Sequence, residues 1–173
     1  MALQLARVLT NARIIGTASR PDSIAWAQSM GAHHIVNHHL SLAEQVLAIA
    51  PEGVTDIISS QATDHHFSDY IALLTPRGKI AVLDAPTSIN VVDLAGKSGS
   101  LYMHNVFTRP VLQTYDMEVQ GRILEDVARL VDSGLIRTTL QREFQGINAD
   151  NLRKAHQILE TGTQVGKLVI TGF

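Results

Sequence analysis

Ser19 and Arg20 carry the clearest chemical signal in this sequence, because they follow a short apolar segment at 13–18 and no acidic residue comes before Asp22. A serine hydroxyl can donate a hydrogen bond to a phosphate, and a guanidinium can pair with one through two parallel N–H groups. An Asp or Glu at such a strand end would instead accept a hydrogen bond from a ribose hydroxyl and disfavour a phosphate there. The pair therefore predicts a site for a phosphorylated ribose; the alternative is a solvated arginine beside a helix cap.

The eight histidines, in a chain without cysteine, raise the question of a metal site. His34 and His38 would lie roughly 13 Å apart along an extended strand that rises about 3.3 Å per residue, too far apart to share one ion. His65 and His66 are neighbours at the start of a predicted helix, so their side chains diverge. No Ser–His–Asp set and no pair of carboxylates stands out either. We therefore expect no zinc and no catalytic side chain in this chain.

The elements that would position these residues alternate between helix and strand in the first half of the sequence. The chain opens with an amphipathic helix at 1–9 that leads directly into a strand at 13–18, the order of the second half of a βαβ unit. Hydrophobic periodicity and capping residues then predict helices at 21–30, 41–50 and 64–74, strands at 34–37, 54–59 and 79–83, and a turn at 75–78. This alternation predicts an α/β fold with a Rossmann-like, doubly wound parallel sheet of about six strands. Its first strand and its glycine-rich turn would precede residue 1, so we expect the fold to lack them.

The second half of the sequence is less regular. We expect a short helix at 92–97, a strand at 100–107, a long helix at 117–133, a strand at 138–144, a helix at 149–160 and a strand at 167–171. Five apolar residues at helical spacing should face the core from the long helix: Ile123, Leu124, Val127, Leu130 and Val131. We find no internal repeat and no linker, so residues 1–173 are predicted to form one truncated dinucleotide-binding domain.

Composition excludes several classes of protein. The net charge of −2 provides no field that would attract nucleic acid or an anionic membrane surface. No apolar run approaches the roughly 20 residues that a membrane-spanning helix needs. Gln4 and Arg7 interrupt an N-terminal segment that lacks the basic start of a signal peptide. The absence of cysteine excludes disulfides and thiolate metal sites, and we expect a cytoplasmic protein.

Several short segments occur in an order and at a spacing that resemble one superfamily. They lie at 1–7, 16–20, 30–37, 75–79, 107–110, 130–134, 155–160 and 166–170. Together they resemble the medium-chain dehydrogenase/reductase superfamily, and within it the quinone-oxidoreductase-like and zinc-type alcohol dehydrogenase-like branch. The resemblance implies the cofactor domain of an oxidoreductase that binds a nicotinamide dinucleotide. It also implies that the N-terminal GroES-like catalytic domain of the family is absent, so we expect a truncated chain.

Within this resemblance, the absence of an acid at the end of the 13–18 strand indicates NADP(H), with Ser19 and Arg20 at the adenosine 2′-phosphate. His38 stands where relatives often have a tyrosine near the adenosine phosphate; an exposed loop histidine is the alternative. The remaining candidates follow later strands, because ligands lie at the carboxyl ends of strands in such sheets. Ser60 and Gln61 are expected at the adenine ribose, Asp84 and Ala85 at the nicotinamide ribose, and the backbone of Val106, Phe107 and Thr108 at the carboxamide. For each of these residues, plain loop structure is the alternative.

The resemblance further implies that the strand at 100–107 lies at an edge of the sheet and joins two subunits. This strand carries no Lys, Arg, Asp or Glu, and an uncharged edge is a template for pairing with a second chain. We therefore expect a homodimer through this strand, with no nucleic-acid or membrane partner.

Two interpretations follow. In the first, the chain is the NADP(H)-binding portion of an oxidoreductase that transfers hydride to a quinone, an enone or a carbonyl substrate. Cofactor binding would then be weak or lost in this fragment, and the chain alone inactive, because the pyrophosphate-binding turn and the substrate domain are missing. In the second, the chain is a catalytically silent Rossmann-like module that serves structure or dimerisation. Binding of NADPH, NADH and 2′-phospho-ADP distinguishes the two interpretations.

Overall fold

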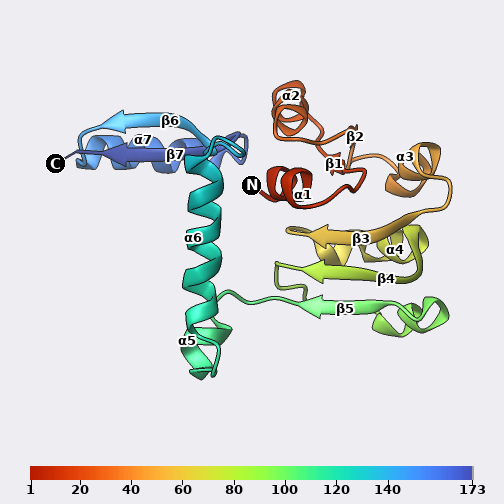
Figure 1. Cartoon of the computed structure of the whole chain (residues 1–173). Helices are drawn as coiled ribbons and strands as arrows, with labels where there is room; N and C mark the ends of the chain where they lie inside the picture. The colour runs from red at the N-terminus through yellow and green to blue at the C-terminus, as the bar shows by residue number, and fades with distance from the viewer. Residues whose placement is uncertain (173) are drawn as a thin grey trace. The chain divides into compact units, whose positions relative to one another are not determined.

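The computed structural model describes residues 1–172 and divides the chain into two compact units. The terminal unit contains Met1–Ile35 and the segment from Asp126 onwards, and the central unit contains Val36–Glu125. Figure 1 shows the elements of both units. That residues 1–173 form one domain stays a prediction.

Helix α1 opens the terminal unit and is anchored by a buried polar side chain. The first four elements are α1 (Ala2–Leu9), β1 (Ile15–Thr17), α2 (Pro21–Ser29) and β2 (His34–Val36), and the two strands pair with each other. The side-chain amide of Gln4 donates to the carbonyl oxygen of Arg137 and accepts from its N–H, both at 2.9 Å. The residue that interrupts the apolar face of α1 thus joins this helix to a segment 133 residues away.

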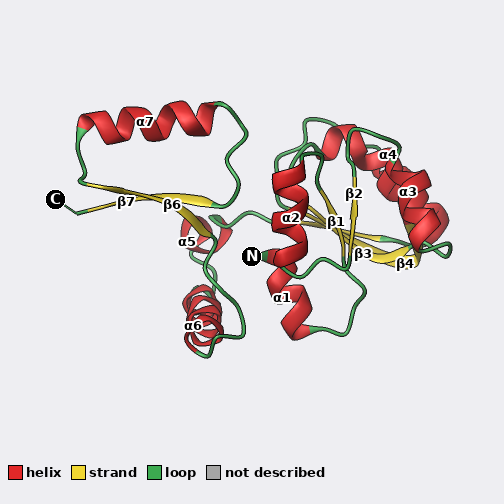
Figure 2. Cartoon of the chain, turned by 90° about the horizontal axis from the view of Figure 1, so that it is seen from above, coloured by secondary structure: helices red, strands yellow, loops and turns green. Residues whose placement is uncertain are grey.

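The C-terminal part of the same unit is a parallel β–α–β arrangement. β6 (Leu140–Gln145) pairs in parallel with β7 (Lys167–Thr171), and α7 (Ala149–Glu160) connects them. Figure 2 shows α7 along one side of the two strands. The Asn148 side chain caps α7 by accepting a hydrogen bond from the N–H of Asn151 at 2.9 Å, a role for which asparagine is preferred.

The central unit contains a three-stranded parallel sheet in the order β3–β4–β5. Its elements are α3 (Leu42–Ile49), β3 (Val54–Ser59), α4 (Thr63–Leu73), β4 (Leu74–Val82), the 3-10 helix η1 (Val91–Lys97), β5 (Ser100–Met103) and α5 (Thr108–Leu112). Ser41 caps α3 as predicted, since its hydroxyl accepts from the N–H of Glu44. Helix α6 (Glu118–Asp132) follows and ends in the terminal unit.

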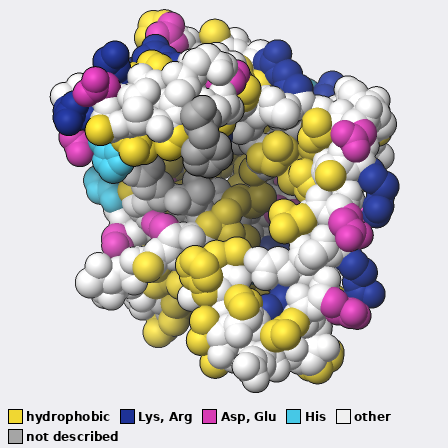
Figure 3. Space-filling model, turned by 90° about the vertical axis from the view of Figure 1, so that its left-hand side faces the viewer, with side chains coloured by type: hydrophobic (Ala, Val, Ile, Leu, Met, Phe, Trp, Pro, Cys, Tyr) yellow, Lys and Arg dark blue, Asp and Glu magenta, His cyan; other side chains and the backbone are white. Residues whose placement is uncertain are grey.

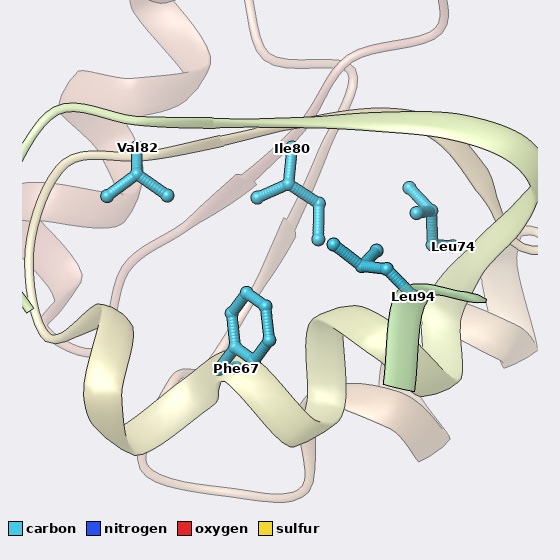
Figure 4. Packing of buried hydrophobic residues seen from close by; sticks show 5 residues of the cluster. All are labelled: Phe67, Leu74, Ile80, Val82 and Leu94. Atoms are coloured by element: carbon cyan, nitrogen blue, oxygen red, sulfur yellow. The ribbon is translucent and has the colours of Figure 1, made fainter. Parts of the chain in front are cut away.

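The core of the central unit is formed by side chains of α4, β4 and η1. Five of them are buried and pack together (Figure 4): Phe67, Leu74, Ile80, Val82 and Leu94. Ile80 and Val82 have no exposed surface. They point to the same face of β4 because side chains alternate along a strand, and α4 covers that face (Figure 4).

The α/β fold with parallel strand pairing is confirmed, but the strands do not form one six-stranded sheet. Hydrogen bonds link β1 to β2, β3 to β4 and β5, and β6 to β7. A doubly wound sheet places its first strand between the second and the fourth. Among residues 1–172 no hydrogen-bonded ladder joins β1, which would be second in that order, to β3, which would be fourth.

The predicted turn at 75–78 lies inside the bounds of β4. Leu74 and Lys79 both pair with β3, and the chain bulges between them. Arg77 adopts a left-handed conformation in this bulge, with φ +64°. Residues 75–78 therefore form a local bulge instead of ending the strand, and the pairing of β4 with β3 resumes at Lys79.

The predicted strand at 100–107 is too long, because β5 ends at Met103. The Asn105 side chain accepts a hydrogen bond from the N–H of Phe107 at 2.9 Å. Such a local bond from an asparagine competes with a strand ladder, and it turns the chain toward α5.

Helix α6 forms as predicted, but its apolar face is not buried as predicted. Ile123 and Leu124 are 49% and 64% exposed, and the other three apolar residues are half-buried. Helical periodicity is enough to make an amphipathic helix, whereas burial also needs a partner surface. Hydrophobic side chains also lie exposed in groups on the face shown in Figure 3.

None of the helices in residues 1–172 is long and apolar enough to cross a membrane. A cytoplasmic location stays a prediction. On the face shown in Figure 3, Lys and Arg side chains are interspersed with Asp and Glu, and no continuous basic patch is seen there.

Candidate functional site

The carboxyl ends of β3, β4 and β5 lie in line at one edge of the sheet of the central unit. Ser59 pairs with Val82, and Val82 pairs with Met103, so the loops after these parallel strands leave from the same edge. The segments after these strands hold most of the predicted contacts of this unit: Ser60 and Gln61 after β3, Asp84 and Ala85 after β4, and Val106, Phe107 and Thr108 after β5. All three groups therefore start from the edge at which ligands of parallel α/β sheets bind.

Asp84 caps helix α4 with its carboxylate. Oδ2 accepts a hydrogen bond from the backbone N–H of Thr63 at 3.0 Å, and Oδ1 accepts one from the hydroxyl of the same residue. Thr63 is the first residue of α4 and is fully buried, so the carboxylate lies at the positive end of the helix dipole. The hydroxyl and then the amide of Thr63 hold the pKa of Asp84 below its usual value. Each oxygen of this half-buried carboxylate thus has a partner inside the protein.

Three hydrogen-bonded hydroxyl groups lead from Asp84 toward the interior of the central unit. Ser59 Oγ lies 2.7 Å from Thr63 Oγ1 and 3.0 Å from the hydroxyl oxygen of Tyr70. Because an ionised carboxylate only accepts hydrogen bonds, Thr63 donates to Asp84, and Ser59 then donates to Thr63. Burial raises the pKa of Tyr70, so its protonated hydroxyl donates to Ser59. This series of hydroxyl groups was not predicted from the sequence, since the spacing of Ser59, Thr63 and Tyr70 does not show that they meet.

A second carboxylate, on α4, connects the same helix start and the same loop after β4 in the opposite direction. Asp64, the next residue of α4, accepts hydrogen bonds from the backbone N–H groups of Thr87 and Ser88, both at 3.1 Å. The turn between β3 and α4 holds Ala62 at φ +58°, a left-handed conformation that is uncommon for residues other than glycine. The start of α4 and the loop after β4 are therefore tied to each other in both directions.

Replacing Asp84 with asparagine should lower the stability of the central unit at neutral pH, and the loss should shrink in acid. A folded-state pKa below the ordinary value of 3.8 means that the stability contributed by the carboxylate is complete above that value. It is lost as the pH falls through the folded-state pKa. Urea unfolding of the wild type and of Asp84→Asn at about pH 7 and about pH 3 measures the difference.

Asp56→Asn is the matched control for this experiment. Asp56 is exposed on β3, and its carboxylate has no hydrogen-bond partner among residues 1–172, so its replacement should leave stability nearly unchanged at both pH values. A stability deficit of Asp84→Asn that is as large in acid as at neutral pH would contradict the capping role of the ionised carboxylate.

The other candidates of the central unit lie in loops, except Thr108, which is the first residue of α5. Val106 and Phe107 are 63% and 65% exposed, and the carbonyl of Val106 accepts a hydrogen bond from the Gln120 side chain at 3.4 Å. His38 follows β2, is half-buried, and packs edge-on against the ring of His39 at a centroid distance of 4.5 Å. These residues are placed near strand ends, as predicted, and their role in binding stays a prediction.

Ser19 and Arg20 lie between β1 and α2 in the terminal unit. Arg20 is the N-cap residue of α2, and its backbone N–H donates to the hydroxyl of Ser23 at 3.2 Å. Its guanidinium donates to the carbonyl oxygen of Thr163 at 3.0 Å, which leaves further N–H groups of the fork for a second acceptor. Arg20 is thus both an exposed arginine beside a helix cap and a guanidinium that a backbone carbonyl orients.

The part of the chain that the structure describes contains no set of side chains that could bind a metal ion. Among residues 1–172, no three His, Asp or Glu side chains come close enough together to hold an ion. The side chains of His65 and His66 do not diverge as predicted, because their rings meet edge to face at a centroid distance of 4.6 Å, but among residues 1–172 no third ligand joins them. We therefore assign no step to zinc in this chain.

Comparison with known proteins shows where the chain belongs. A family profile described as zinc-binding dehydrogenase matches residues 1–119. The zinc-type alcohol dehydrogenase-like protein of Staphylococcus epidermidis (strain ATCC 12228 / FDA PCI 1200) is 34% identical over 171 residues, which are 98% of this chain and 51% of that protein. The chain thus spans about half the length of the curated relatives it matches.

Solved structures show the same fold. A Rhizobium etli CFN 42 protein assigned as a zinc-dependent alcohol dehydrogenase is 41% identical, with a TM-score of 0.92 over 99% of this chain and 50% of that one. A quinone oxidoreductase from Pseudomonas syringae pv. Tomato DC3000 shares the fold alone, at 18% identity and a TM-score of 0.77 over 99% of this chain and 52% of that one. The chain belongs to the zinc-binding dehydrogenase family within the medium-chain dehydrogenase/reductase superfamily, and it has the Rossmann-like α/β fold of that superfamily.

Proposed function

We propose that this chain is the NADP(H)-binding portion of an oxidoreductase that transfers hydride to a quinone, an enone or a carbonyl compound. The observation that carries the proposal is the edge formed by the ends of β3, β4 and β5, which exposes Ser60, Gln61 and Ala85 in a member of a dehydrogenase family. Ligands of parallel α/β sheets bind at such edges. When bound, the dinucleotide supplies the hydride, and the protein supplies binding, orientation and electrostatics.

The groups at this edge fit a ribose or a carboxamide better than a phosphate. The Ser60 hydroxyl and the Gln61 amide can both donate and accept, as ribose hydroxyls require. The N-terminus of α4 offers no anion site, because the carboxylate of Asp84 already accepts from its first N–H. We therefore place the adenine ribose at Ser60 and Gln61, the nicotinamide ribose beside Ala85, and the carboxamide at the backbone of 106–108.

A phosphate of the cofactor is proposed to meet Ser19 and Arg20. The guanidinium of Arg20 is exposed and already oriented by the carbonyl of Thr163, which reduces the side-chain entropy lost when it pairs with an anion. No acid lies between β1 and Asp22 to repel a 2′-phosphate, and this favours NADP(H) over NAD(H). In the central unit, His38 is proposed as a contact of an adenosine phosphate.

Isothermal calorimetry with NADPH, NADH and 2′-phospho-ADP tests the proposal on the chain itself. We expect weak, saturable binding of NADPH and 2′-phospho-ADP, with NADH binding more weakly than NADPH. No heat of binding with any of the three at millimolar concentration would contradict the proposal and favour a catalytically silent structural module. Tighter binding of NADH would contradict the choice of cofactor alone.

The same proposal includes a homodimer through β5. This strand is an edge of its sheet, as predicted, and Tyr102 and Met103 are 47% and 57% exposed on it. An uncharged edge can pair with a second copy in a two-fold arrangement. Sedimentation should show a dimer at micromolar concentration, and Met103→Lys should shift it toward monomer because the interface would bury an unpaired charge.

Leu40→Lys is the control for the dimer. Leu40 is 63% exposed in the loop before α3 and belongs to the same unit, so the added lysine should leave sedimentation unchanged. A wild type that sediments as a monomer at every concentration would contradict the dimer.

A further inference from the structure

We propose that Asp84 and Asp64 act as a reciprocal carboxylate clamp that holds the two loops of the cofactor edge in their binding shape. The clamp joins the β3–α4 turn at 60–62 to the loop at 84–88 after β4. This inference rests on the proposed function, and it gives Asp84 a positioning role in place of the ribose contact expected from the sequence. Thr63 is the second positioning residue, because its N–H and its hydroxyl donate to the carboxylate of Asp84.

Two carboxylates that point in opposite directions make the connection rigid. Asp84 reaches from the loop after β4 to the N–H and hydroxyl of Thr63. Asp64 reaches from the first turn of α4 back to the N–H groups of Thr87 and Ser88. Neither loop can shift without breaking hydrogen bonds to a charged acceptor, which are stronger than those between neutral groups.

The clamp is supported from inside the central unit. Thr63 is fully buried, and Ser59, which is 2% exposed, donates to its hydroxyl from the last position of β3. Tyr70, about two helical turns further along α4, extends this support through its hydrogen bond to Ser59. The ionised carboxylate of Asp84 can only accept, and this fixes the direction of each hydrogen bond from Tyr70 through Ser59 to Thr63. The Thr63 hydroxyl therefore has one orientation and one acceptor.

The backbone conformation at Ala62, between β3 and α4, indicates that the clamp affects ligand binding as well as stability. Ala62 is held at φ +58° and ψ +35°, between exposed Gln61 and buried Thr63. A non-glycine residue persists in this conformation only where its surroundings determine it, and such residues cluster at binding sites. The clamp holds Ala62 in this conformation and orders Ser60 and Gln61 before a ligand binds. This reduces the conformational entropy that is lost on binding.

Thr63→Val and Thr63→Ser form the central pair of variants. Valine keeps the shape of threonine and removes the hydroxyl, whereas serine keeps the hydroxyl. We expect Thr63→Val and Asp64→Ala each to weaken NADPH and NADH alike, by about 10-fold, and Thr63→Ser to bind like the wild type. Asp93→Ala is the control, because Asp93 is exposed in η1 and, among residues 1–172, its carboxylate accepts only from Asn90.

Hydrogen exchange of the Thr63, Thr87 and Ser88 amides in the free chain reports the clamp without any cofactor. Faster exchange at these amides in Thr63→Val and Asp64→Ala, together with the common loss of affinity and its rescue in Thr63→Ser, is the expected result. Unchanged exchange, or faster exchange with unchanged affinity, would overturn the clamp while leaving the proposed function standing. A wild type that binds neither dinucleotide would overturn the proposed function, and the positioning role with it.

Discussion

Ile80→Ala is expected to lower the free energy of unfolding of the central unit by about 2–5 kcal/mol. Ile80 is fully buried in the middle strand β4, where it pairs with Ile57 of β3 and Leu101 of β5. Its side chain packs in the same cluster as Phe67 and Leu94 (Figure 4). Truncation leaves a cavity whose walls belong to the sheet and two helices, and such walls relax only partly.

Ile58→Ala removes the same atoms from the neighbouring strand and is the matched control. Ile58 is 59% exposed, so its loss should change stability by no more than about 0.5 kcal/mol. Hydrogen exchange of the β4 amides in increasing urea measures the central unit directly, and the fluorescence of Trp26, the single tryptophan, reports the terminal unit. Equal losses in the two variants would show that the core does not lie where the structure places it.

Arg20→Ala is expected to reduce the affinity for NADPH about 10- to 100-fold and to leave the affinity for NADH almost unchanged. The guanidinium is the one group in this proposed contact that pairs with a doubly charged phosphate through two hydrogen bonds. NADH lacks that phosphate, so it loses nothing when the guanidinium is removed. Calorimetric titration of both dinucleotides gives the ratio of affinities, which should fall to about one.

Arg153→Ala controls for the loss of a positive charge in the same unit. Arg153 is an exposed arginine of α7 that pairs with Asp150 at 2.7 Å, and its removal should leave the ratio unchanged. Arg20→Lys should fall between wild type and Arg20→Ala, because lysine keeps the charge but not the planar fork. Equal losses for NADPH and NADH in Arg20→Ala would contradict the assigned role of Arg20. The same equal losses are expected of the clamp variants, so the two roles can be told apart.

Elements with local signals could be predicted from the sequence. β3, α7 and β7 have the predicted bounds, and α3 begins after the predicted cap Ser41. Periodicity, caps and chain breakers act over a few residues, so one sequence contains them in full. The burial of α6 could not be predicted in this way, because it depends on a partner surface rather than on the period of the helix.

The links that shape the candidate site could not be predicted, because they join distant residues. Thr63 and Asp84 are 21 residues apart, and Arg20 and Thr163 are 143 residues apart. Single serines, threonines and aspartates at strand ends are common, and nothing in their spacing shows which pairs will meet. The strand-end rule placed Asp84 at the correct edge of the sheet, and only the structure shows that its carboxylate turns to α4.

The measurement that tests the central claim most directly is an NMR titration of the isotopically labelled chain with NADPH. If the carboxyl edge of β3–β5 binds the dinucleotide, the amides of Ser60, Gln61 and Ala85 should shift progressively with NADPH concentration, and less so with NADH at the same concentration. The amides of Ile123 and Leu124 on exposed α6 should not move. No shift at millimolar NADPH, or shifts on α6 with none at the sheet edge, would contradict the account.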